Sequence, residues 1–264
     1  MTKTPPSGST LHALAILESF DVAHVSQSLT VISRRLGIPK ATALRILRAL
    51  EERRYVFRNP HDGSYSLSFG VLALAQRYLA EFEILTILRP VLAELAAETG
   101  ETAHFGVLQE TEVVYLDIAE SPQRVRAYVL RGDNIPAHCV AAGKAILAHA
   151  ERSKLEHFLA ADRARLTPAT IVDRDQFLDE LEQTRRRGYA LNMGEWMPDV
   201  TGVSAPVFSR IELVAGAVGV AGPISRLDLA RAHHVGEIVR RYAAKISEVL
   251  GGLNTARPGT PAAE

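Results

Sequence analysis

The 264-residue chain has a single cysteine, Cys139, and this scarcity excludes an internal disulfide and a zinc site built from several thiolates. It has no uninterrupted apolar run close to the roughly 20 residues that span a bilayer, so we expect no membrane contact. Residues 1–9 carry one positive charge with no apolar segment behind it, which excludes a secretory signal. The reducing cytoplasm is therefore the expected location.

The chain also has no net charge, because 30 basic side chains balance 30 acidic ones. The balance is not uniform along the chain. Residues 1–68 contain nine Lys and Arg against five Asp and Glu, and the other 196 residues carry the compensating acidic excess. This asymmetry indicates a polyanion-binding end joined to a domain of another kind. With 47% hydrophobic residues, the chain has enough apolar material for two cores.

Residues 29–52 have the pattern of two helices separated by a tight turn. Ser28 is suited to cap the first helix. Leu29, Ile32 and Leu36 then share one face at spacings of three and four residues. Gly37 follows and ends this helix. A helix, a short turn with glycine and a second helix form a helix-turn-helix, so this segment predicts DNA binding.

The second helix presents two different faces. Pro39 suits its first turn, because the N–H that proline lacks would have no partner there. The residues predicted to be buried are Ala43, Leu44, Leu47 and Leu50. The exposed face of such a helix enters the major groove of DNA. The candidate DNA contacts on it are Lys40, Thr42, Arg45 and Arg48.

A predicted β-hairpin follows this second helix. Residues 55–58 and 64–67 have strand patterns, and the turn between them contains Asn59, Pro60 and Gly63. A hairpin in this place is the wing of a winged helix-turn-helix. Arg58 and His61 are the candidate wing contacts, and we expect them to touch the DNA backbone rather than the bases.

The remaining sequence predicts an α+β fold. Residues 69–82 have helical spacing and would link the winged helix to the rest. Further helices are predicted at 84–98 (interrupted by Pro90), 141–150, 152–159, 173–187 and 227–250. Strands are predicted at 102–108, 113–118, 125–130, 189–193, 202–208 and 213–221. The first three strands are joined by short turns that leave no room for crossover helices, so the sheet should be mostly antiparallel.

Several motifs point weakly to other chemistry. The segment around Gly143 and Lys144 lacks the first glycine and the Ser/Thr of a phosphate loop, and the segment after Gly202 lacks the second glycine of a nucleophile elbow. The His138–Cys139 and His233–His234 pairs have no third or fourth ligand for a metal. We therefore expect no metal, no cofactor and no enzymatic activity.

Six segments carry a resemblance to a known family: residues 11–18 (LHALAILE), 36–45 (LGIPKATALR), 100–102 (GET), 135–145 (IPAHCVAAGKA), 203–208 (VSAPVF) and 220–223 (VAGP). In order and spacing, the chain resembles the IclR family of bacterial transcription regulators from about residue 10 to residue 251. The resemblance implies a winged helix-turn-helix (residues 10–68) that binds operator DNA, a linker helix (69–83) and a GAF-like domain (84–251) that binds a small organic acid. It also implies homodimers, commonly pairs of dimers. Residues 1–9 and 252–264 are predicted to be disordered.

The candidate effector site combines the resemblance with a local argument. A helix that begins near Val140, Ala141 and Ala142 would offer backbone N–H groups to a carboxylate, although small residues there also permit tight packing. By resemblance, the other residues that line the pocket are Asn192, Glu195, Val200, Gly202, Gly219 and Ala221. Several relatives carry Cys or Ser where this chain has Gly202, Gly219 and Ala221. The resemblance therefore predicts an acid that is larger or more apolar than a two- or three-carbon acid, and an aromatic acid meets this description.

Trp196 is the only tryptophan and lies beside these positions. It can stack on an aromatic ligand, or it can belong to a core or an interface. Two function classes remain open after these steps. The first is a ligand-responsive transcription regulator, and the second is a small-molecule sensor or enzyme whose helix-turn-helix serves protein contacts only.

Overall fold

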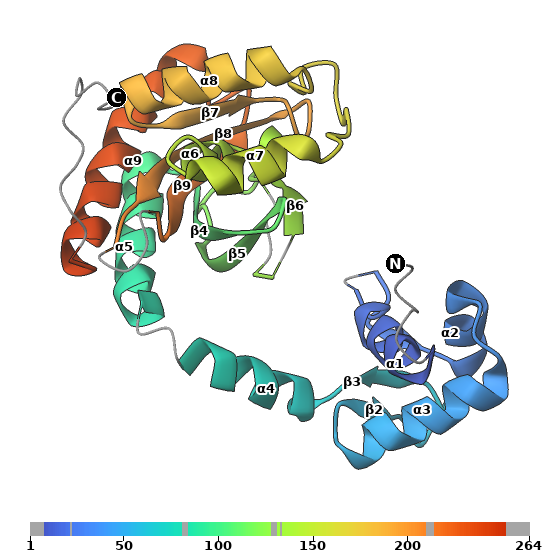
Figure 1. Cartoon of the computed structure of the whole chain (residues 1–264). Coiled ribbons are helices and arrows are strands. Elements are labelled where there is room, and N and C mark those ends of the chain that lie inside the picture. Colours follow the sequence, from blue (N-terminus) through green and yellow to red (C-terminus); the bar gives the residue numbers. More distant parts are fainter. Residues whose placement is uncertain are drawn as a thin grey trace. The chain divides into compact units, whose positions relative to one another are not determined.

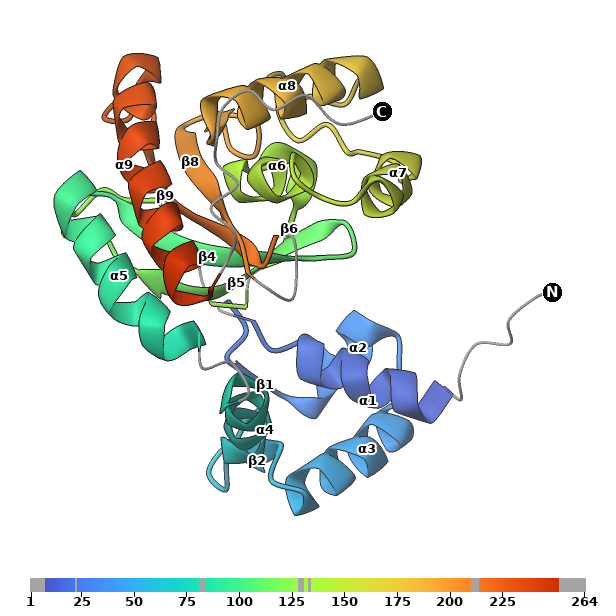
Figure 2. The ribbon, with the colours of Figure 1, turned by 60° about the vertical axis from the view of Figure 1, so that its left-hand side comes forward.

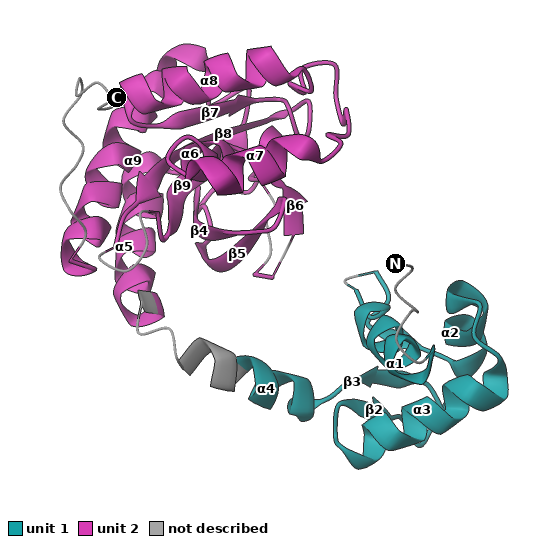
Figure 3. Cartoon of the chain, in the orientation of Figure 1, with its two compact units in different colours: residues 1–83 teal, residues 84–264 magenta. Residues whose placement is uncertain are grey.

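The computed structural model describes residues 8–21, 23–80, 84–127, 131–132, 134–209 and 214–251. The chain divides into two compact units, Met1–Glu83 and Ile84–Glu264, which Figure 3 shows in different colours. The predicted tail at 252–264 lies outside the described residues, whereas the first helix begins at Gly8, inside the segment predicted to be disordered. Among the described helices, none is long and apolar enough to cross a bilayer.

The described part of the N-terminal unit contains a core of three helices and a small sheet, followed by a fourth helix that is described below (Figure 1). The helices are α1 (Gly8–Glu18), α2 (Leu29–Leu36) and α3 (Lys40–Glu52). The antiparallel sheet has the order β1-β3-β2, built from Ser26–Gln27, Tyr65–Leu67 and Val56–Arg58. The side chains buried between these elements are Ile16, Ile32, Ile38, Ala43, Ile46, Leu47, Val56 and Tyr65. This is the predicted winged helix-turn-helix, extended by the short strand β1.

Local interactions set the turn between α2 and α3. The Ser28 hydroxyl accepts a hydrogen bond from the Val31 N–H, and Gly37 ends α2 in the left-handed region with a φ of 65°. Both predictions are confirmed. Pro39 is the N-cap of α3 rather than a residue of its first turn.

The buried face of α3 differs in part from the prediction. Ala43 and Leu47 are buried as expected, but Ile46 is buried too, whereas Leu44 and Leu50 are only half-buried. Leu50 still packs against this core, so the prediction is wrong at Leu44 and it missed Ile46.

Helix α4 (Phe69–Ala80) is attached to the end of α3 by backbone hydrogen bonds. The Ser68 N–H donates to the Tyr55 carbonyl at 2.9 Å, and the Gly70 N–H donates to the Arg54 carbonyl at 2.8 Å. A Cβ atom on Gly70 would lie 2.5 Å from that same carbonyl oxygen, so only glycine permits this approach. The first turn of α4 is therefore held against the segment that follows α3.

The C-terminal unit is built on a six-stranded antiparallel sheet with the order β6-β5-β4-β9-β8-β7. The strands are β4 (Thr102–Gln109), β5 (Glu112–Ala119), β6 (Asn134–Pro136), β7 (Ala190–Met193), β8 (Val200–Val207) and β9 (Gly216–Pro223). Helices α5 (Ile84–Thr99) and α9 (Leu229–Val249) lie side by side in Figures 1 and 2, joined by the Glu94–Lys245 and Glu98–Arg241 ion pairs. Helices α6 (Ala141–Leu147), α7 (Arg152–Ala160) and α8 (Arg174–Arg187) lie over the side of the sheet opposite to α5 and α9. The fold is α+β, as predicted.

Two predictions for this unit need correction. Residues 125–127 form no strand, and the rest of the predicted strand at 125–130 lies outside the described residues. The strand next to β5 is instead Asn134–Pro136, which the sequence analysis missed. Pro90 does not interrupt α5 either. The helix continues because Leu88 and Leu92, on either side of the proline, are both buried and outweigh the one lost hydrogen bond.

Candidate DNA interface and effector pocket

The basic side chains of α3 are free of local partners. Lys40, Arg45 and Arg48 are exposed, and Thr42 is half-buried. In the described part of the chain, these three cations form no ion pair, whereas Arg35 on α2 lies 3.5 Å from the Asp21 carboxylate. Exposed cations without an internal counter-ion are suited to contact phosphate or base edges. The four predicted residues of α3 therefore remain candidates for DNA contact.

The wing has a well-defined turn. The Asn59 carboxamide oxygen accepts from the His61 N–H, and the Asp62 carboxylate accepts from both the backbone and the hydroxyl of Ser64. These bonds from Ser64 lower the pKa of the Asp62 carboxyl. Arg58 and His61 are exposed, and the Arg58 guanidinium lies 5.9 Å from the centre of the Tyr65 ring. The turn thus presents both predicted wing contacts to solvent.

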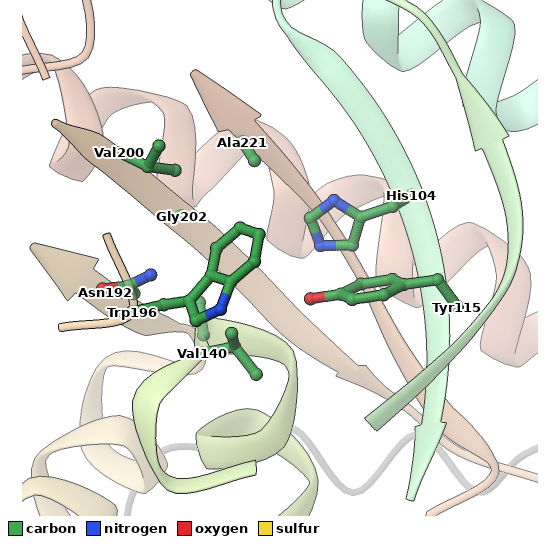
Figure 4. Close-up of a pocket in the computed structure, with 9 residues that line it drawn as sticks. His104, Tyr115, Val140, Asn192, Trp196, Val200, Gly202 and Ala221 are labelled. Atoms are coloured by element: carbon green, nitrogen blue, oxygen red, sulfur yellow. The ribbon is translucent and has the colours of Figure 1, made fainter. Parts of the chain in front are cut away.

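A small pocket, partly open to solvent, lies in the C-terminal unit between the sheet and the start of α6 (Figure 4). Seven of the ten predicted effector residues line it: Val140, Ala141, Asn192, Trp196, Val200, Gly202 and Ala221. Two lining residues, His104 and Tyr115, were not predicted. Figure 4 shows Trp196 on one side of the space and His104 with Tyr115 on the other.

The three other predicted effector residues do not line the pocket. Ala142 is buried within α6. A Cβ atom on Gly219 would lie 2.0 Å from the Ser204 hydroxyl oxygen, so this glycine adds no room for a ligand. Its lack of a side chain instead makes space for Ser204. Gly202 differs from Gly219, because a Cβ atom there would lie 3.5 Å from the nearest atom and would meet no clash.

The third residue, Glu195, is engaged in a buried ion pair. Its Oε1 lies 2.6 Å from the Lys144 ammonium of α6, which is also 3.5 Å from the Glu180 carboxylate of α8. Burial raises the pKa of the Glu195 carboxyl, although Lys144 opposes this shift. The Glu195 N–H donates to the Asn192 side-chain oxygen at 2.7 Å, which leaves the Asn192 amide nitrogen on the side of Gly202. Glu195 therefore contacts the pocket only indirectly, through its ion pair with Lys144 and its hydrogen bond to the pocket residue Asn192.

The loop that carries Trp196 is fixed by further hydrogen bonds. The Thr167 hydroxyl donates to the Gly194 carbonyl, and the Thr170 hydroxyl donates to the Glu195 carbonyl, each at 2.7 Å. Trp196 is itself partly buried against the core of this unit. With its loop bound to α6 and to residues 167–170, Trp196 forms a wall of the pocket in a preset position.

His104 and Tyr115 come from neighbouring strands, β4 and β5. Their rings meet edge to face with centres 4.9 Å apart. His104 is 3% exposed, and its Nε2 lies 3.3 Å from the Ser204 hydroxyl. Burial lowers the pKa of His104 to about 4, so the imidazole is neutral near pH 7. A lone histidine within an apolar strand was the available sign in the sequence, but its position in the pocket depends on strand register.

His138 and Cys139, considered earlier as a metal-ligand pair, are buried and have hydrogen-bond partners within the protein. Within the described ranges, no group of three or more His, Cys, Asp or Glu residues could hold a metal ion. His138 is hydrogen-bonded to the Ala164 carbonyl at 2.9 Å. Burial, with a smaller contribution from Glu195, raises the pKa of the Cys139 thiol to about 12, so it stays protonated and unreactive.

Comparison with known proteins agrees with this architecture. Residues 9–60 match the IclR helix-turn-helix domain, and residues 76–248 match the C-terminal domain of bacterial IclR transcriptional regulators. The glycerol operon regulatory protein of Streptomyces griseus is 36% identical over 225 residues, which cover 84% of this chain and 88% of that protein. The transcriptional regulator XynR of Escherichia coli is 30% identical over 240 residues, which cover 90% and 95%.

A solved structure extends the likeness to three dimensions. The IclR transcriptional regulator of Alicyclobacillus acidocaldarius superposes with a TM-score of 0.79 at 29% identity, over 91% of this chain and 97% of that one. The two domain matches together span the helix-turn-helix formed by α2 and α3, helix α5 and the six-stranded sheet. This protein belongs to the IclR family, and it is a DNA-binding transcription regulator with a C-terminal effector domain rather than an enzyme.

Proposed function

We propose that this regulator binds a two-fold-related operator through α3 and the wing, and that an organic acid with an aromatic body modulates this binding from the pocket. The observation that carries the effector part is the lining of the pocket, in which Trp196 and Tyr115 accompany small or aliphatic residues. Aromatic walls favour stacking and edge contacts with a planar ligand. The protein would act in the cytoplasm, where its DNA target lies.

The DNA contacts divide by position. Lys40, Thr42 and Arg45 belong to the N-terminal half of α3, the part of a recognition helix that reaches base edges. Arg48, farther along α3, and Arg58 and His61 on the wing are assigned to the phosphate backbone. One such helix reads few base pairs, so useful specificity requires two copies of the chain on one operator. We therefore propose a homodimer, or a dimer of dimers, as the DNA-binding species.

The carboxylate of the effector is assigned to the Ala141 end of the pocket. Val140 is the N-cap of α6 and supplies no side-chain hydrogen bond, so the N–H groups of Ala141 and Ala142 have no side-chain cap. The helix has only seven residues, and it would contribute individual N–H groups rather than a long dipole. The Asn192 amide nitrogen beside Gly202 would add a donor, and the body of the acid would extend toward Trp196.

The alternative is a sensor whose helix-turn-helix serves protein contacts only. Affinity for fragments of the upstream DNA, measured at several salt concentrations, separates the two because phosphate contacts release counter-ions. A regulator should show a steep fall in affinity with salt, and benzoate-like acids should shift the affinity. Salt-independent or absent DNA binding would favour the alternative, and calorimetric binding of short aliphatic diacids alone would contradict the aromatic effector.

Light scattering tests the proposed assembly. The chain has a mass of 28.8 kDa, so the DNA-free and DNA-bound protein should give protein masses of at least twice that value. A monomer in both states would contradict the two-copy operator complex.

A further inference from the structure

One residue that lines the pocket has a buried polar atom without a partner among the described residues. The Nδ1 atom of His104 is buried and accepts or donates no hydrogen bond among the described residues, although the side chain lines the pocket. Buried polar atoms in folded proteins almost always have a partner, and an exception in a binding cavity points to a ligand atom. Figure 4 shows the imidazole between Ala221 and Tyr115, across the space from Trp196.

The environment of His104 determines which ligand atom it suits. The ring is neutral, because burial lowers its pKa to about 4. A neutral imidazole presents one N–H and one lone pair. The lining residues include no Lys, Arg, Asp or Glu. This side of the pocket therefore suits an uncharged polar group on an otherwise apolar body.

The other ring nitrogen of His104, Nε2, has Ser204 as its partner, and Gly219 leaves room for that serine. The Ser204 hydroxyl lies 3.3 Å from His104 Nε2, in space that a side chain at Gly219 would occupy. A hydroxyl can donate to Nε2 or accept from it, so Nδ1 can in turn be the acceptor or the donor. A ligand hydroxyl matches either arrangement, because it also donates and accepts.

We propose that His104, supported by Ser204, is a specificity-determining residue that hydrogen-bonds a hydroxyl on the body of the effector, away from its carboxylate. The effector is thereby narrowed to a hydroxylated aromatic acid. This inference rests on the proposed function, since it assumes that an aromatic acid occupies the pocket. It assigns His104 to recognition of an uncharged group, whereas Ala141 and Asn192 face the acid end.

Calorimetry on the full-length protein tests this with benzoate and its 3-hydroxy and 4-hydroxy derivatives. One hydroxylated acid should bind roughly tenfold more tightly than benzoate, the order expected for a hydrogen bond that satisfies a buried group. In His104→Phe, which keeps an aromatic ring, the preference for the hydroxylated acid over benzoate should disappear. Ser204→Ala should reduce the preference in part and covers the case that His104→Phe does not fold.

The matched control is His149→Phe. His149 is another neutral histidine with an unpartnered buried Nε2, but it packs on Phe208 and does not line the pocket. This variant should keep the native preference. Benzoate binding without a preference for either hydroxylated acid, or the same preference in His104→Phe and Ser204→Ala as in the native protein, would overturn the inference and leave the proposed function standing. Failure of all three acids to bind would overturn both.

Discussion

The Lys144 ammonium and the Glu195 carboxylate lie 2.6 Å apart, with side chains that are only 1% and 7% exposed. This ion pair joins α6 to the loop that carries Trp196, and thereby connects two walls of the pocket. Removal of one partner from a buried pair leaves an uncompensated charge, which is more costly than the pair is stabilising.

Lys144→Met should therefore lower the free energy of unfolding of the C-terminal unit by about 3–5 kcal/mol. Glu195→Gln should cost less, because Glu180 remains 3.5 Å from the ammonium. Urea unfolding followed by the fluorescence of Trp196, the only tryptophan, measures both variants. Equal midpoints for Lys144→Met and the native protein would show that the pair is not a structural link.

Arg45→Ala should weaken operator binding by about 1–3 kcal/mol, the range for one lost base contact. The reason is that Arg45 is exposed on α3 and unpaired among the described residues. Fluorescence anisotropy with operator DNA measures the change. Arg186→Ala is the matched control, since it removes an Arg that is 77% exposed in the C-terminal unit and should leave the affinity unaltered. An unchanged affinity in Arg45→Ala would place α3 outside the groove.

Arg58→Ala on the wing should reduce the affinity for all DNA sequences by a similar factor, because phosphate contacts carry no base information. The slope of log affinity against log salt should become shallower by about one unit. Selection of preferred bases from a random pool gives the second readout. A changed base preference in Arg58→Ala would assign this side chain to base recognition instead.

Gly202→Leu should abolish effector binding and leave DNA binding intact, because its side chain would fill the space beside Ala141 and Asn192. Gly202→Ala is the control and should bind the effector nearly as well, since an added Cβ would lie 3.5 Å from its nearest neighbour. Calorimetry and anisotropy measure the two activities separately. Native effector affinity in Gly202→Leu would move the binding site elsewhere.

Stability should depend on pH through His104. Its pKa is about 4 in the folded protein and close to 6.5 when unfolded, so the unfolded chain binds more protons between these values. The stability that this group contributes is present above pH 6.5 and is lost as the pH falls toward 4, by roughly 3 kcal/mol at about 1.4 kcal/mol per pKa unit. His149, whose pKa is also lowered to about 4 by burial, contributes to the same window, so His104→Phe should reduce the pH dependence of the urea-derived stability without removing it. An unaltered pH profile would show that the His104 ring is not buried as a neutral group.

The parts of the fold that could be predicted from sequence are those with local causes. The Ser28 cap and the Gly37 stop each depend on atoms a few residues away, so both were found. The strand Ser26–Gln27 was missed because its pairing partner, Tyr65–Ser66, is distant in sequence and two residues have no periodicity. Ile46 was missed because helical periodicity alone did not show which way α3 faces.

The pocket illustrates the same limit. Family resemblance brought Asn192, Gly202 and Ala221 to one place, because their spacing is shared with relatives. It did not reveal His104, whose position against Ser204 depends on the registers of β4, β9 and β8. The resemblance also could not show that Lys144, 51 residues earlier in the chain, donates a hydrogen bond to Oε1 of Glu195.

The hydrogen bond from Gly70 to Arg54 has a mechanical consequence. It fastens the first turn of α4 to the residue next to the C-cap of α3, at a position where no side chain fits between the two backbones. Rotation of the first turn of α4 is therefore coupled to the segment that directly follows α3 through this backbone contact. Relative movement of α3 and α4 is therefore expected away from the Gly70–Arg54 contact.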